Sequence, residues 1–95
     1  MSNQQESPDF AKIKLLVSEN TPPRWTIVSK ANGTDYYFQL SVPDGRFGPR
    51  LIAELEITDH HSRVALHVVK PSKSQRELLS TAQNEIFSRL SKIPF

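Results

Sequence analysis

The chain has 95 residues, of which 37% are hydrophobic and 23% charged, and its formal net charge at pH 7 is +2. This length has room for one domain only, and so small a net charge does not by itself indicate a strongly anionic partner. Because the sequence contains no cysteine, disulfides, thiolate metal sites and a cysteine nucleophile are excluded.

Residues 1–6 are polar, and we expect them to be disordered, followed by a single domain over residues 7–95. The first ten residues lack the basic and then apolar layout of a signal peptide. No apolar run reaches the ~18 residues that a transmembrane helix needs. We therefore expect a cytoplasmic protein.

The first ordered element is expected at residues 8–19. Ser7, Pro8 and Asp9 supply a capping residue, a proline at the first helical position and an acid in the first turn, so they predict a helix. Its buried side would consist of Phe10, Ile13, Leu16 and Val17. Ile13, Leu15 and Val17 also alternate with Lys12, Lys14 and Leu16, which fits a strand, and both interpretations stay open. Pro22 and Pro23 end the element in either case.

A first hairpin is expected next, because the hydrophobic period changes to two from Trp25 onward. Asn32-Gly33 is a strong signal for a tight turn, and it leads into a return strand over residues 36–42. The apolar residues of that strand occupy the even positions and Tyr37, Gln39 and Ser41 the odd ones. This pattern is typical of a sheet that is covered on one side only.

A second hairpin follows, with strands over residues 51–58 and 63–70 and a turn at residues 59–62. In its first strand Leu51, Ala53, Leu55 and Ile57 are predicted to face the core. Ile52, Glu54, Glu56 and Thr58 alternate with them and are predicted to face outward. In its second strand the inward positions are Val64, Leu66 and Val68.

The segment from Ser74 to Lys92 predicts an amphipathic helix. Its apolar residues recur at spacings of three and four, namely Leu78, Leu79, Ala82, Ile86, Leu90 and Ile93. Ser74 followed by Glu77 predicts a capping box at its start.

Taken together, the elements predict an α+β domain in the order α-β-β-β-β-α. Two adjacent hairpins form a four-stranded antiparallel meander, and the C-terminal amphipathic helix packs on one face of it, with a short N-terminal helix as the first element. The predicted core is Trp25, Ile27, Phe38, Leu40, Leu51, Ala53, Leu55, Ile57, Val64, Leu66, Val68, Leu78, Leu79, Ala82, Ile86 and Leu90.

Residues with catalytic or metal-binding chemistry are few. Adjacent histidines at a turn, here His60 and His61, usually point apart, whereas a metal site needs several converging ligands. Glu54 and Glu56 would share the solvent face of the sheet, where paired carboxylates serve as surface charge and pair with Arg63 or Lys30. We therefore expect no enzyme activity, no cofactor and no metal.

The loop from Asp44 to Arg50 is more suggestive of binding. Phe47 lies between glycines and is flanked by Arg46 and Arg50, and arginine and aromatic residues are enriched at protein contact surfaces. For the loop itself we favour the other interpretation, a long hairpin connection whose Phe47 plugs the end of the core. With Tyr37 on the open face, these residues are the predicted contacts of a protein partner: Tyr37, Arg46, Phe47 and Arg50.

Nucleic-acid binding is the alternative function. A sheet that carries aromatic and basic residues can stack single-stranded bases, although Glu54 and Glu56 on the same face oppose it. Its predicted contacts are Arg24, Lys30, Arg63, Lys70, Lys73 and Arg76. The sequence thus favours a small non-enzymatic regulatory or adaptor protein that binds another protein, with a homodimer as one form, over a nucleic-acid binder.

Overall fold

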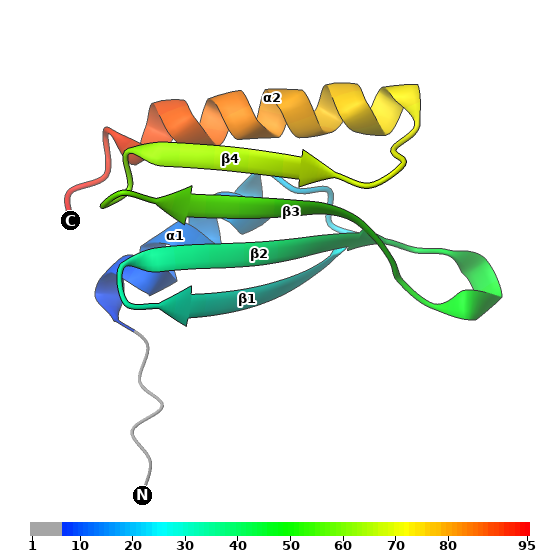
Figure 1. The fold of residues 1–95 in the computed structure, drawn as a ribbon, viewed down its shortest axis with the longest axis horizontal. Coiled ribbons are helices and arrows are strands. Elements are labelled where there is room, and N and C mark those ends of the chain that lie inside the picture. Colours follow the sequence, from blue (N-terminus) through cyan, green and yellow to red (C-terminus); the bar gives the residue numbers. More distant parts are fainter. Residues whose placement is uncertain (1–6) are drawn as a thin grey trace, which may run out of the picture.

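The computed structural model describes residues 7–95, so the predicted disorder of residues 1–6 lies outside the described residues. Two helices and four strands follow in the predicted order (Figure 1). Their bounds are α1 Pro8–Glu19, β1 Thr26–Asn32, β2 Asp35–Val42, β3 Arg50–Thr58, β4 Arg63–Val68 and α2 Lys73–Leu90, with the 3-10 turn η1 at Gly45–Phe47. The α+β meander predicted from the sequence is confirmed.

The four strands form one antiparallel sheet in the order β1-β2-β3-β4. The first hairpin closes at the predicted place: Asn32 pairs with Asp35, and Gly33 and Thr34 form the two-residue turn. Gly33 has φ +65°, while Thr34 has no positive φ. A two-residue hairpin turn with a positive φ at its first position favours glycine there, because a Cβ would be strained.

A register shift interrupts the pairing of β2 with β3. Leu40 pairs with Ala53 and the next residue, Ser41, pairs with Leu51, so Ile52 has no partner on β2. Past this bulge the alternation of inward and outward side chains changes phase. The prediction that Ile52 faces outward is therefore wrong: Ile52 and Ala53 are both fully buried.

The helical interpretation of residues 8–19 is confirmed, and the strand alternative is wrong. The Ser7 hydroxyl accepts a hydrogen bond from the Phe10 amide at 3.1 Å, which satisfies one of the free N–H groups at the start of α1. Ile13, Leu16 and Val17 are buried against the sheet, as the helical spacing indicates.

Helix α2 begins earlier than predicted. Its capping box joins Ser72 to Gln75: the Ser72 hydroxyl accepts from the Gln75 amide at 3.2 Å, and the Gln75 side chain accepts from the Ser72 amide at 2.8 Å. The predicted box of Ser74 with Glu77 is wrong. Ser72 with Gln75 and Ser74 with Glu77 have the same spacing, so both fit a capping box. The earlier one begins the helix directly after Pro71 and so includes more residues in its hydrogen-bonded turns.

Both helices cover the same face of the sheet, and the core lies between the two layers (Figure 1). Helix α2 packs along β4, and α1 packs near β1. The predicted core is confirmed for most of its residues, which are buried or pack partly buried against the core. It is wrong for Leu51, which pairs with Ser41 past the bulge and is only partly buried, and for Leu78 and Val68, which are 39% and 36% exposed. The observed core also contains Tyr36, Val42 and Ile52, which the prediction lacks. Leu78 lies to the side of the stripe that Leu79, Ile86 and Leu90 present to the sheet.

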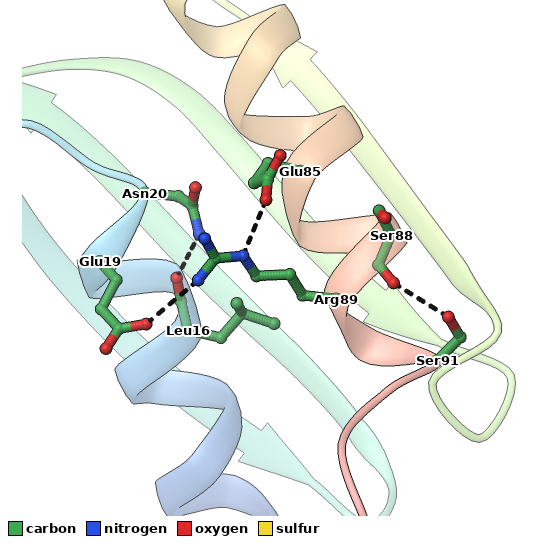
Figure 2. Close-up of polar contacts among 7 residues, drawn as sticks. All are labelled: Leu16, Glu19, Asn20, Glu85, Ser88, Arg89 and Ser91. Atoms are coloured by element: carbon green, nitrogen blue, oxygen red, sulfur yellow. Dashed lines mark hydrogen bonds and ion pairs between the residues drawn. The ribbon is translucent and has the colours of Figure 1, made fainter.

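Arg89 connects the two helices (Figure 2). Its Nε donates to Glu85 on α2 at 2.8 Å, and its Nη1 lies 3.7 Å from a carboxylate oxygen of Glu19 on α1. Asn20 closes the end of α1 by donating from its side chain to the Leu16 carbonyl at 2.9 Å. These contacts link the two helices at the protein surface, while the buried residues of both helices join the core.

Candidate functional site

The connection between β2 and β3 extends beyond the end of the sheet (Figure 1). Within it η1 forms one tight turn, closed by a hydrogen bond from the Phe47 amide to the Asp44 carbonyl at 3.1 Å. Gly48 follows with φ 79° and ψ −167°, a conformation open essentially to glycine alone. The connection therefore has a defined shape, and it presents its side chains away from the core.

Phe47 is the most exposed large hydrophobic residue among those described, at 83% of its surface. The interpretation that Phe47 plugs the end of the core is therefore wrong. Leaving a phenylalanine in water forgoes about 1.5–3 kcal/mol of burial free energy. Because no residue among 7–95 buries its ring, Phe47 is the main candidate for a binding contact on this loop.

The two predicted arginines lie beside Phe47, both exposed. The Nε of Arg50 is 3.9 Å from a carboxylate oxygen of Asp44, a loose surface ion pair that keeps the guanidinium accessible to other partners. The residues Asp44 to Arg50 are called the tip loop below.

Tyr37 is not part of the tip loop. It pairs with Lys30 on β1 and Glu56 on β3, five residues along β2 from Val42, the last residue of the strand. At about 3.3 Å per residue this separation is roughly 17 Å. The structure thus brings Arg46, Phe47 and Arg50 together and places Tyr37 on a different surface.

That surface is the open face of the sheet, opposite the helices, where β1, β2 and β3 form a shallow groove of about 450 Å³. Its lining residues are Val28, Lys30, Asn32, Tyr37, Phe38, Gln39, Glu54, Leu55 and Glu56. Glu54 and Glu56 both face it, as predicted. Their partners differ from the predicted Arg63 and Lys30, because Glu54 accepts from Gln39 at 3.3 Å and Glu56 lies 3.6 Å from His67.

The end of the sheet next to the tip loop is basic. Strand pairing places the start of β1, the end of β2, the start of β3 and the end of β4 together there, and α2 begins at the same end (Figure 1). The flanking segments 22–25, 43–50 and 69–77 contain only Asp44 and Glu77 as acids. Their basic residues, all exposed, are Arg24, Arg46, Arg50, Lys70, Lys73 and Arg76. This set is called the basic end.

Only some of the residues predicted to contact nucleic acid lie at the basic end. Arg24, Lys70, Lys73 and Arg76 belong to it, whereas Lys30 lies in the groove and Arg63 at the opposite end of β4. The structure adds Arg46 and Arg50, which the sequence had assigned to a protein contact. Sequence spacing does not group the six residues because they come from three separate segments of the chain, 22–25, 43–50 and 69–77.

The turn between β3 and β4 carries the two adjacent histidines. Asp59, His60 and His61 all have positive φ, between 52° and 73°. The His61 ring packs between Tyr36 and Phe95, with ring centroids 5.5 and 4.2 Å apart, and its Nε2 atom is buried without a hydrogen-bond partner. His61 therefore acts as a packing residue that holds the C-terminal residues.

Within residues 7–95 no group of three or more His, Asp and Glu side chains is placed to hold a metal ion. In the same part of the chain neither helix has both the length and the apolar composition to cross a membrane.

No protein-family model, no curated protein and no solved structure matches the chain.

Proposed function

We propose that this protein is a small non-enzymatic regulatory or adaptor protein that binds another protein through the tip loop. The observation that carries the proposal is the exposure of Phe47, 83% of its surface, on a turn of defined shape between two exposed arginines. A cytoplasmic location, which the cysteine-free sequence fits, is part of the proposal.

The chemistry of the tip loop specifies the kind of partner. Phe47 would enter an apolar pocket, where burial of its ring supplies the binding energy, and Arg46 and Arg50 would meet acidic groups at the rim of that pocket. Because η1 and the Phe47–Asp44 hydrogen bond already hold the loop, less conformational entropy is lost on binding than for a flexible loop.

The test compares two exposed phenylalanines. A photo-crosslinking amino acid at position 46 identifies the partner in cells, and the affinity of the purified pair is then measured by calorimetry. We expect Phe47→Ala to weaken binding by at least tenfold, the effect of a central contact residue. Phe87→Ala is the matched control, because Phe87 is 54% exposed on α2, away from the loop, and it should leave the affinity unchanged. An affinity that does not depend on Phe47 would overturn the proposal.

Nucleic-acid binding is the second candidate function, and the basic end is the observation that favours it. Six exposed basic residues and the start of α2, with its partial positive charge, lie together there, although the net charge of the chain is only +2. The groove is less suited to nucleic acid because it presents Glu54 and Glu56.

A further inference from the structure

The two edges of the sheet differ in how they are covered. At the β4 edge α2 runs alongside the strand, and the side chain of Gln83 donates to the Val64 carbonyl at 3.0 Å (Figure 1). At the β1 edge, within residues 7–95, no hydrogen bond reaches the strand from any element except β2. An edge strand with unpaired main-chain groups is a template for another strand.

The first hairpin determines which groups of β1 point outward. Asn32 and Asp35, which flank the two-residue turn, form a hydrogen-bonded pair, and such pairs alternate with non-hydrogen-bonded pairs along an antiparallel ladder. Ile27, Ser29 and Ala31 are then the residues whose N–H and C=O groups face away from β2. These six groups form the free edge.

We propose that β1 pairs antiparallel with β1 of a second copy of the chain, about a two-fold axis through Ser29. Ser29 is the middle residue of the seven in β1. It is also the middle one of the three residues whose main-chain N–H and C=O groups point away from β2. The pairing therefore places all seven residues opposite a partner, and Ile27, Ser29 and Ala31 satisfy their main-chain groups with Ala31, Ser29 and Ile27 of the second copy.

The side chains of β1 are compatible with this pairing. On the open face Lys30 lies opposite Val28 of the second copy, so no two like charges are directly opposed. The strand contains no proline and no bulge, which are common protections of a free edge, and Val28 is 55% exposed. The resulting sheet has eight continuous strands. The pairing uses only the β1 edge, so it is independent of the tip loop.

Two substitutions of Val28 test the register. In the dimer each residue 28 faces Lys30 of the other copy, twice per dimer, so Val28→Lys creates two like-charge pairs and Val28→Glu creates two opposite-charge pairs. We expect the dissociation constant, measured by sedimentation, to rise about fivefold for Val28→Lys and to fall about fivefold for Val28→Glu. A wild-type chain that stays monomeric at all concentrations would overturn the proposal, and so would equal weakening by both substitutions.

A covalent test checks the axis directly, because the chain has no cysteine of its own. Ser29→Cys brings two cysteines opposite each other, with Cα atoms about 5.5 Å apart, a distance that a disulfide spans. Lys30→Cys is the control on the same strand, since its copies are offset diagonally. We expect oxidation to yield a covalent dimer much faster for Ser29→Cys. Equal rates, or faster crosslinking of Lys30→Cys, would contradict the proposed axis.

Discussion

At the scale of single residues, Ile52 shows how much one position in a strand can matter. It is the extra residue of the bulge in β3, its side chain is fully buried, and its carbonyl accepts a hydrogen bond from the Val69 amide at 2.7 Å. Because the bulge changes the phase of the alternation, Ile52 and Ala53 lie in the core together.

The first stability prediction follows from this burial. Replacing Ile52 with alanine should lower the free energy of unfolding by about 2–5 kcal/mol, since it removes buried methylene groups and leaves a cavity. Leu51→Ala should cost clearly less, because Leu51 is only partly buried. Urea denaturation of both variants makes the comparison. A larger loss for Leu51→Ala would mean that simple alternation continues through the bulge.

At the scale of elements, helix α2 packs against the sheet, and the residue that caps its N-terminus determines where it begins. The Ser72 hydroxyl accepts a hydrogen bond from the Gln75 amide. Ser74 instead lies inside the first turn of the helix, and its hydroxyl is 3.2 Å from the Ser72 hydroxyl. The chain reaches this cap through Lys70, which has φ +44° and reverses the direction after β4. The tertiary path of the chain thus selects one of two equivalent capping sequences.

A pair of serine substitutions tests which cap is used. Ser72→Ala should lower the free energy of unfolding by about 1 kcal/mol, which corresponds to a fall of roughly 5 °C in Tm for a domain of this size. Ser74→Ala should leave Tm within about a degree or raise it slightly, because alanine favours a helix interior over serine. Thermal unfolding followed by circular dichroism measures both, and the reverse order would restore the predicted Ser74 cap.

At the scale of the whole molecule, charge is distributed unevenly although its sum is small. Half of the twelve lysines and arginines lie at the basic end, with only Asp44 and Glu77 in the same segments. A partner that meets this end encounters a local positive field that the net charge of +2 does not reveal.

Two single charge reversals, one at each end of the sheet, test the nucleic-acid alternative. If the basic end binds nucleic acid, Lys73→Glu should weaken binding to a short single strand and make it less dependent on salt. Glutamate is well tolerated in the first turn of a helix, so α2 should remain folded. Arg63→Glu changes the net charge equally at the opposite end and should have a much smaller effect. Titrations at two salt concentrations that show no binding, or equal losses for both variants, would exclude this site.

The sequence by itself determined the order of elements and both hairpins, because these depend on local signals: hydrophobic period, the Ser7-Pro8 start and the glycine turn at Gly33. It also indicated Arg46, Phe47 and Arg50 as neighbours, since they are close along the chain. Only the tertiary structure decided that Phe47 points into solvent, that Ile52 is buried and that six basic residues share one end. It also decided that, among residues 7–95, β2 alone pairs with β1. These properties depend on which distant segments become neighbours. Strand register and helix packing determine which segments become neighbours. The local hydrophobic period of the sequence does not carry that information.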